Sequence, residues 1–222
     1  NLQRVLLALP AESHARRKEI LETLRPLHIG IQVLPSLDQM IQGQAISSSL
    51  QDVTIEDLLG RDEIPSDPQL MDQEIRGKSL MVTGAGGSIG SELCREILKH
   101  EPRRLILFEI SEFSLYRLQQ DLSDQDVHRT VPVLGNILDE ERLSRILTEH
   151  DVQTVFHAAA YKHVPLIEDN ALEGLKNNVL GTKTLLKECM ESDVSSFILI
   201  STDKAVRPTS VMGASKRIAE MI

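Results

Sequence analysis

Two short segments near the end of the chain carry side chains that could move protons. Residues 201–204, Ser-Thr-Asp-Lys, place a carboxylate beside an ammonium group, and residues 212–216 begin with methionine and end with lysine. Carboxyl and amino groups are common proton donors and acceptors in enzymes, whereas a thioether has no proton to give. If these segments are catalytic, Met212 cannot do the acid–base work, and Asp203 beside Lys204 offers the groups that can.

A glycine-rich segment at 84–90 could hold a phosphate group. It follows an apolar run that predicts a strand, and it opens an amphipathic run that predicts a helix. In this order Gly84 allows a tight turn, Gly87 lets the backbone approach a pyrophosphate, and Gly90 lets helix and strand pack closely. The amides at the helix start would bind the anion. We therefore predict a dinucleotide site from these residues: Gly84, Gly86, Gly87, Ser88, Ile89 and Gly90.

The ends of two further predicted strands lie where they could contact the same cofactor. Glu109 ends the second strand, where a carboxylate can accept hydrogen bonds from the adenosine ribose. The carboxylate would also repel the extra phosphate of NADP, so Glu109 favours NAD, although arginines lie nearby in the sequence. A solvated acid is the alternative. Asn136 and Ile137 follow the third strand, where a chain reversal could contact the adenine.

Short apolar runs alternate with longer helix-period segments over residues 78–222. This order predicts a parallel sheet with helices on its faces, the Rossmann-type doubly wound α/β fold. We expect strands at 79–83, 104–108, 130–134, 154–157 and 196–200. Helices are expected to begin near Ser88, Glu112, Asp139, Pro165 and Val211, with the fourth running on towards Met190.

The first part of the chain predicts a smaller α/β remnant. Within residues 1–45 we expect a strand, a helix and a strand at 4–9, 15–27 and 29–34. Residues 46–77 are rich in serine, proline and acids, which predicts a linker with one short helix at 55–59. Residues 1–34 look like the end of an α/β domain that begins upstream, and the last predicted helix is still apolar at Ile222, so we expect truncation at both ends.

The composition argues against several function classes. A formal net charge of -9 and a pI of about 5.3 disfavour a nucleic-acid or anionic-membrane surface, which needs a basic face. Cys94 and Cys189 have no metal or redox spacing, so we expect packed thiols in a reduced, cytoplasmic chain and no metal. No apolar run approaches the ~20 residues that cross a bilayer, which predicts a soluble chain.

Four motifs together resemble the extended short-chain dehydrogenase/reductase superfamily: Thr83–Gly90, His157–Ala160, Ser201–Lys204 and Met212–Lys216. Three more segments narrow the resemblance to the large, membrane-anchored UDP-N-acetylglucosamine 4,6-dehydratases of bacterial polysaccharide biosynthesis: Tyr161–Pro165, Asn178–Thr182 and Asp203–Thr209. The resemblance is strong over residues 50–222. Residues 1–45 resemble, less specifically, the end of the extra nucleotide-binding-like domain of those proteins.

The resemblance implies a reaction, a cofactor and a location. The reaction is dehydration of a UDP-sugar, in which NAD takes a hydride from carbon 4, water leaves across carbons 5 and 6, and the hydride returns to carbon 6. The parent protein would lie at the cytoplasmic face of the bacterial inner membrane, held there by helices absent from this chain. Homo-oligomers are common in the superfamily, so a homo-oligomer is a further expectation.

The resemblance also implies residue roles. Asp203 would protonate the departing hydroxyl, and Lys204 would be the base at carbon 5, which requires a lowered pKa. Lys216 would bind the nicotinamide ribose, and Thr202 would bind the hydroxyl at carbon 4 or a water there. Met212 stands where the tyrosine of the superfamily's Tyr-x-x-x-Lys motif would be, so we hypothesise that Asp203, or a water that it orders, also takes the carbon 4 hydroxyl proton.

Other residues of the resembling motifs have more open roles. We expect the cofactor to be contacted by Ala158, Ala159 and Ala160, and the substrate by Lys162, His163, Asn178 and Arg207. Tyr161, Lys162 and His163 could face either the nicotinamide or the sugar. Asn178 could equally be a satisfied buried amide, Arg207 a solvated loop residue, and His157 a structural residue that shapes the cofactor loop.

Two other functions remain open at this point. A nucleotide-sugar 4-epimerase could use the same scaffold, but it usually needs the tyrosine that Met212 replaces. A catalytically inactive, NAD-binding regulatory domain would suit the methionine, but it leaves the carboxylate and lysines of residues 203–216 without a purpose. The resemblance also implies that the substrate-binding domain would follow Ile222 and is missing here, so the chain alone should bind NAD without appreciable turnover.

Overall fold

The computed structural model describes residues 4–7, 19–20, 23–24, 30–33, 51–52 and 67–222. The chain divides into two compact units, Asn1–Ser66 and Asp67–Ile222. None of the described helices is long and apolar enough to cross a membrane.

The first unit contains a small three-stranded sheet. Strand β1 (Arg4–Leu7) pairs in parallel with β2 (Gly30–Val33), as the two predicted strands would. Strand β3 (Gln51–Asp52) pairs antiparallel with β2 and was not predicted, because it lies in the polar segment expected to be a linker. Of the predicted helix at 15–27, only residues 19–20 and 23–24 are described, and both pairs are helical. The predicted helix at 55–59 lies outside the described residues.

The second unit is built on a five-stranded parallel sheet with the order β6-β5-β4-β7-β8. The strands are β4 (Ser79–Thr83), β5 (Arg104–Glu109), β6 (Thr130–Leu134), β7 (Thr154–His157) and β8 (Ser196–Leu199). All five were predicted to within one residue. The strand order reverses between β4 and β7, and in such sheets ligands bind at the carboxyl ends of the strands beside this reversal. The predicted doubly wound α/β fold is confirmed.

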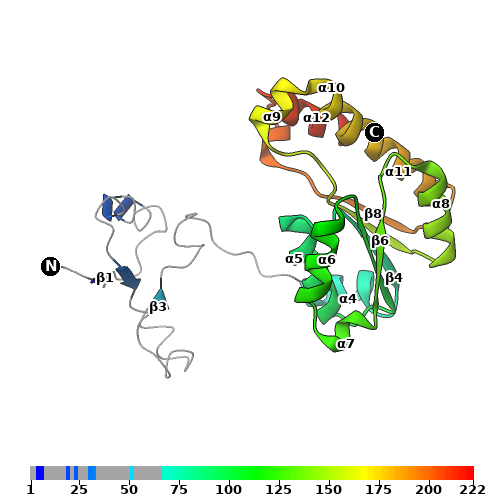
Figure 1. The fold of residues 1–222 in the computed structure, drawn as a ribbon, viewed down its shortest axis with the longest axis horizontal. Helices are drawn as coiled ribbons and strands as arrows, with labels where there is room; N and C mark the ends of the chain where they lie inside the picture. Colours follow the sequence, from blue (N-terminus) through cyan, green and yellow to red (C-terminus); the bar gives the residue numbers. More distant parts are fainter. Residues whose placement is uncertain (1–3, 8–18, 21–22, 25–29, 34–50, 53–66) are drawn as a thin grey trace. The chain divides into compact units, whose positions relative to one another are not determined.

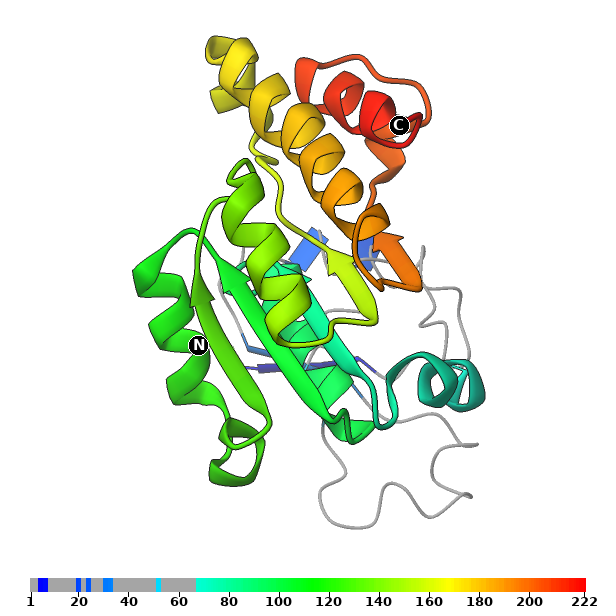
Figure 2. The same cartoon turned by 90° about the vertical axis from the view of Figure 1, so that its right-hand side faces the viewer.

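Helices cover both faces of the sheet, so the unit has three layers (Figure 1, Figure 2). Helices α5 (Ser88–Lys99) and α6 (Glu112–Asp121) cover one face, and α8 (Glu140–Glu149) and α11 (Gly181–Met190) cover the other. Successive side chains of a strand point to opposite faces of the sheet, so each strand contributes to the hydrophobic core on either face. Leu80 packs with the α5 and α6 residues, and the next residue, Met81, packs with the α8 and α11 residues. A one-turn helix, α7 (Asp124–Val127), precedes β6.

A helix also occupies part of the expected linker. Helix α4 (Pro68–Ile75) is capped by Asp67, whose side chain accepts hydrogen bonds from the first-turn amides, and it carries proline in that turn. Ile75 is fully buried in the same core as Leu80. The structure therefore places this stretch in the second unit, because Ile75 buries apolar surface that a linker would leave in water.

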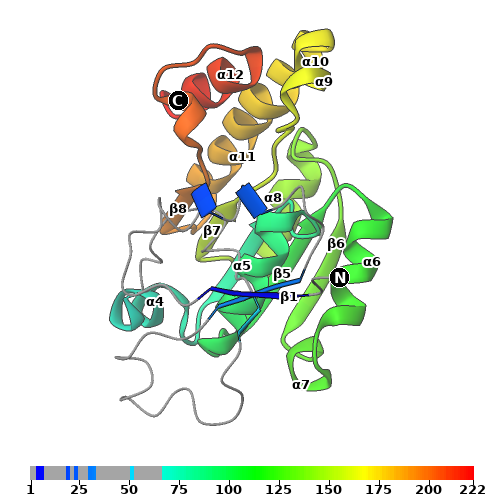
Figure 3. The ribbon, with the colours of Figure 1, turned by 90° about the vertical axis from the view of Figure 1, so that its left-hand side faces the viewer.

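The long helix predicted from Pro165 to Met190 is interrupted in the structure. It consists of α9 (Val164–Asp169), α10 (Ala171–Leu175), the π-helical turn η2 (Lys176–Leu180) and α11. Asn170 breaks the first helix with φ -131° and ψ 48°, and its side-chain amide donates to the carbonyl of Leu166 at 2.9 Å. After β8 come the 3-10 turn η3 (Asp203–Ala205) and helix α12 (Val211–Ala219). Helix α12 lies against α9 and α10 (Figure 3).

Candidate active site

The loop between β4 and α5 has the geometry of a phosphate cradle. Gly84 has φ 68°, and a Cβ atom there would lie 2.7 Å from the Cα atom of Ala159. A Cβ atom on Gly90 would lie 2.0 Å from the carbonyl oxygen of Gly84. Only glycine fits at either position. Because Gly87 caps α5, the amides of the following turn have no acceptor within the helix and are available to an anion.

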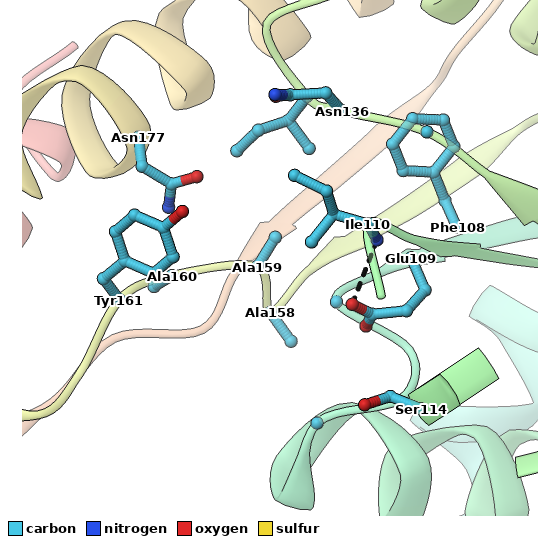
Figure 4. A pocket seen from close by; sticks show the side chains of 14 residues that line it. Phe108, Glu109, Ile110, Ser114, Asn136, Ala158, Ala159, Ala160, Tyr161 and Asn177 are labelled. Carbon is cyan, nitrogen blue, oxygen red and sulfur yellow. Dashed lines mark hydrogen bonds between the residues drawn. The ribbon is translucent and has the colours of Figure 1, made fainter. Parts of the chain in front are cut away.

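A first pocket of about 200 Å³ opens on one side of this loop, at the carboxyl ends of β4, β5 and β6 (Figure 4). Tyr161 and Asn177 lie on one side of it, and Phe108 and Glu109 lie on the other (Figure 4). The expected cofactor residues that line it are Gly84, Gly87, Glu109, Asn136, Ile137, Ala158, Ala159 and Ala160.

Glu109 is held in the first pocket by three backbone amides. Its Oε2 atom accepts from Gly86 N–H at 2.9 Å, and its Oε1 atom accepts from the amides of Ile110 and Ser111 at 3.0 Å each. The side chain is buried rather than solvated. A carboxylate offers about four acceptor positions, so roughly one remains for a ribose hydroxyl. Gly86 itself packs on Ser114 of α6 and lines neither of the two pockets of the cleft.

The turn after β6 closes the far side of the first pocket. The Oδ1 atom of Asn136 accepts from the amide of Leu138 at 2.9 Å, so its amide nitrogen is the group left to face a ligand. Ile137 is buried against Gly181, where a Cβ atom would lie 2.5 Å from the Cδ1 atom of Ile137. This packing fixes the position of the turn.

A second pocket of about 350 Å³ lies on the other side of the glycine loop. It brings the amide-bearing start of α5 together with polar side chains that could do chemistry. Its expected site residues are Ser88, Ile89, Lys162, Thr202, Lys204, Met212 and Lys216. Both pockets are lined by Gly84, Gly87, Ala158 and Ala160, so they form one cleft. Asp203 does not line the second pocket, but the Thr202 hydroxyl donates to its Oδ1 atom at 3.0 Å.

The ammonium group of Lys216 is buried in this cleft. Its Nζ atom donates to the carbonyl of Ile200 at 2.9 Å, which holds α12 against the end of β8. Burial lowers the pKa of Lys216, and the nearby carboxylate of Glu220 acts in the opposite direction. Lys204, in contrast, is an exposed residue of η3.

Met212 is buried at the wall of the second pocket with 3% of its surface exposed. The chain has two tyrosines. Tyr161 lines the first pocket, and Tyr116 lies on α6. No phenol therefore lines the pocket that holds Lys216.

The four expected substrate residues are in different environments. Lys162 lines the second pocket and donates to the Ser88 hydroxyl at 3.4 Å, at the start of α5. His163 lines a third pocket against α9 and α10, which shares Ala160 and Lys162 with the second pocket. Arg207 is exposed beyond η3. Asn178 is buried in η2, and its side chain bonds to both backbone groups of Tyr161 and to Ser215, which is the satisfied amide that the sequence left open.

His157 and the two cysteines are interior groups. His157 lies between the hydroxyls of Thr83 and Thr182, at 2.7 Å and 2.9 Å. Burial raises the pKa of each thiol, Cys94 and Cys189, to about 12, so both are packed thiols. Within the described residues, no three His, Cys, Asp or Glu side chains are grouped so as to hold a metal ion.

Several pocket residues were given no role in the sequence analysis: Phe108, Ile110, Ser114, Ile200, Ser201 and Asn177. Ile110 and Ile200 could have been found, because each adjoins a predicted strand end at the edge where the cofactor was expected. Ser114 and Asn177 come from helices, and only the packing of α6 and η2 brings them to the cleft.

Comparisons with known proteins agree with this geometry. A family model described as polysaccharide biosynthesis protein matches residues 80–222. The capsular polysaccharide biosynthesis protein CapD of Staphylococcus aureus is 41% identical over 223 residues, which is 100% of this chain and 37% of CapD. The chain thus spans little more than a third of that relative.

Two curated enzymes and one solved structure are also similar. A UDP-N-acetylglucosamine 4,6-dehydratase (inverting) of Campylobacter jejuni is 32% identical over 66% of this chain and 42% of that protein. A UDP-glucose 4-epimerase of Rickettsia rickettsii is 35% identical over 65% of this chain and 42% of that protein. The dTDP-glucose 4,6-dehydratase DesIV of Streptomyces venezuelae, solved with NAD, superposes with TM-score 0.57 and 26% identity over 64% of this chain and 49% of its own. The chain belongs to the polysaccharide biosynthesis protein family, within the extended short-chain dehydrogenases/reductases.

Proposed function

We propose that this chain is the NAD-binding part of a nucleotide-sugar 4,6-dehydratase that acts on UDP-N-acetylglucosamine or a similar UDP-N-acetylhexosamine. The observation that carries the proposal is the second pocket, which joins Thr202, Lys204 and Lys216 to the phosphate cradle and has Met212 where a phenol would be. Similarity to the Campylobacter jejuni dehydratase supports the same assignment.

The residues of the cleft fit NAD. The start of α5 would hold the pyrophosphate, the remaining acceptor position of Glu109 would take a ribose hydroxyl, and Lys216 would bind the nicotinamide ribose. When bound, NAD would accept a hydride from carbon 4 of the sugar and return it to carbon 6. The solved relative DesIV was crystallised with NAD, which supports the choice of cofactor.

The chain's own residues would move the protons. With carbon 4 at the ketone level, the hydrogen on carbon 5 is acidic, and Lys204 would remove it as the hydroxyl on carbon 6 leaves. Asp203 would protonate that hydroxyl, so that it departs as water. Lys204 would then return a proton to carbon 5 when the hydride reaches carbon 6, so the reaction needs no external oxidant or reductant.

The proton on the carbon 4 hydroxyl needs its own acceptor. Met212 has none to offer, and the Thr202 hydroxyl is already bonded to the carboxylate of Asp203 at 3.0 Å. We propose that this pair takes the proton, with Thr202 facing the sugar and Asp203 behind it. Asp203 would then act as base in the oxidation and as acid in the elimination.

Incubation of full-length protein carrying this segment with UDP-N-acetylglucosamine and NAD tests the function. A 4-keto-6-deoxy product, identified by NMR, is expected. A 4-epimer product would instead support a 4-epimerase. Similarity to the Rickettsia rickettsii epimerase favours that function, and Met212 in the second pocket counts against it. NAD binding without either product would support an inactive regulatory domain.

Asp203→Asn tests the role of the carboxylate. We expect carbon 4 oxidation to slow by about 10²- to 10⁴-fold, the usual contribution of a positioned acid–base group. Asp169→Asn, an exposed change at the end of α9, is the matched control and should leave the rate near wild type. If Asp203→Asn binds NAD normally and oxidises carbon 4 at the native rate, the assignment fails.

Three further proposals concern the protein that carries this segment. Its membrane attachment and its position on the cytoplasmic face would come from regions outside this chain. A homo-oligomer is proposed on the resemblance alone. Because the chain spans 37% of CapD, we propose that these 222 residues bind NAD without appreciable turnover.

A further inference from the structure

A chain of buried hydrogen bonds crosses the second unit beneath the cofactor cleft. The Thr83 hydroxyl, at the end of β4, lies 2.7 Å from Nδ1 of His157, and Nε2 of His157 lies 2.9 Å from the Thr182 hydroxyl. Thr182 donates to the carbonyl of Asn178 at 2.7 Å. At the other end, the amide of Ala159 donates to the Thr83 hydroxyl at 3.5 Å.

Only one placement of the protons allows every hydrogen bond in this series to form. The single proton of Thr182 goes to Asn178, so its oxygen must accept from His157, which requires a proton on Nε2. Nδ1 then accepts the proton of Thr83, whose oxygen accepts from Ala159. A proton on Nδ1 instead would leave the Thr83 hydroxyl proton without an acceptor in this chain of bonds, and a buried unmade bond is costly.

The chain of bonds joins segments that build the cleft. Thr83 precedes Gly84, whose backbone packs directly on Ala159. Ala158 and Ala160, which follow His157, line both pockets. We propose that His157 is a positioning residue that, as the Nε2–H tautomer, holds the ends of β4 and β7 in register with the turn at Asn178 and so keeps the cofactor cleft in shape.

The surroundings of His157 support an uncharged ring. It is fully buried beside Phe197. Burial lowers the pKa of His157 to about 3, and the positive charge of Lys216 adds to the effect. A protonated ring would also donate at both nitrogens and would reverse the bond from Thr83.

The tautomer can be measured without any ligand. In ¹⁵N-histidine-labelled chain at pH 7, we expect the His157 nitrogen shifts of an imidazole protonated at Nε2 only. A ring protonated at Nδ1, or at both nitrogens, would overturn the proposal. This arm stands whether or not the chain binds NAD.

Substitutions at two threonines distinguish a positioning role from a general effect on stability. This experiment rests on the proposed function, because it measures NADH affinity. Thr182→Val keeps the side-chain shape but removes the hydroxyl, and we expect NADH to bind about three- to tenfold more weakly. Thr182→Ser restores the hydroxyl and should restore most of the affinity. Thr154→Val is the matched control, because Thr154 is also buried and bonded, to Glu74, but at the opposite end of β7.

Thr154→Val should lower the unfolding temperature and leave NADH affinity unchanged. Thr182→Val binding NADH as tightly as wild type would overturn the proposal, as would equal loss of affinity in both valine variants. If the wild-type chain binds no NADH, the proposed cofactor fails instead, and the tautomer measurement alone decides the role of His157.

Discussion

Glu109→Gln offers a sharp test of the cleft, because the structure assigns three backbone donors to this one carboxylate. The amide oxygen of glutamine can keep the bonds from Ile110 and Ser111, but its NH₂ group then faces the amide of Gly86, donor against donor. One charge-assisted bond is lost, at about 1.5–3 kcal/mol, in a side chain that is only 7% exposed. We therefore expect the free energy of unfolding of the second unit to fall by about 2 kcal/mol.

Thermal unfolding followed by circular dichroism measures this change. For a unit of this size about 2 kcal/mol corresponds to a fall in Tm of roughly 4–8 °C. The affinity for NADH should also fall by about tenfold, since the glutamine oxygen is already engaged and the ribose loses its acceptor. Glu112→Gln is the control: it removes an exposed acid from the first turn of α6, and should change stability by less than about 1 kcal/mol. An unchanged Tm and unchanged NADH affinity in Glu109→Gln would refute the reasoning.

Three further predictions concern other parts of the second unit. Gly90→Ala should abolish NADH binding in a titration, because its Cβ atom would lie 2.0 Å from the Gly84 carbonyl oxygen. Gly77→Ala is the control, because Gly77 has a positive φ but open space around it. It should lower the free energy of unfolding in urea by only about 1–2 kcal/mol and leave NADH binding intact. Lys216→Met should weaken NADH binding by about tenfold or more, with little loss of stability because it also removes a buried charge. The exposed change Lys183→Met is the control and should alter neither NADH binding nor stability. Strong NADH binding by Lys216→Met would count against the proposed role of Lys216. The folded-state pKa of His157 is depressed to about 3 from 6.5, so its contribution to stability is present above pH 6.5 and is lost as pH falls towards 3. The free energy of unfolding should fall by up to about 1.4 kcal/mol per pH unit in this window. Urea unfolding from pH 7 to pH 4.5 should therefore show a steeper loss for wild type than for His157→Gln.

The strands and the phosphate loop were predictable because local patterns determine them. Five apolar runs between helix-period segments match β4 to β8, since strands covered by helices on both faces are mostly apolar. Gly84, Gly87 and Gly90 could be assigned from their order alone, because the steric demands of the turn and of the packed helix act within a few residues.

The parts that escaped prediction depend on contacts distant in sequence. Nothing local marks Ile75 as a core residue, since its partners in the sheet follow it, and the segment before it is polar. The break at Asn170 and the π turn around Asn178 lie within an apolar pattern that continues as if unbroken. The sequence placed Glu109 correctly at a strand end, but it could not show that three amides would converge on the carboxylate.

Helix α4 has a consequence for how the second unit begins. Glu74 receives hydrogen bonds from Thr154 and Ser196, which are the first residues of β7 and β8. The cofactor cleft lies at the last residues of the same strands and beyond them. Helix α4 is therefore attached at the end of the sheet where β7 and β8 begin, a full strand length from the opening of the cleft. A force applied through α4 would therefore act first on that end of the sheet and not at the opening of the cleft.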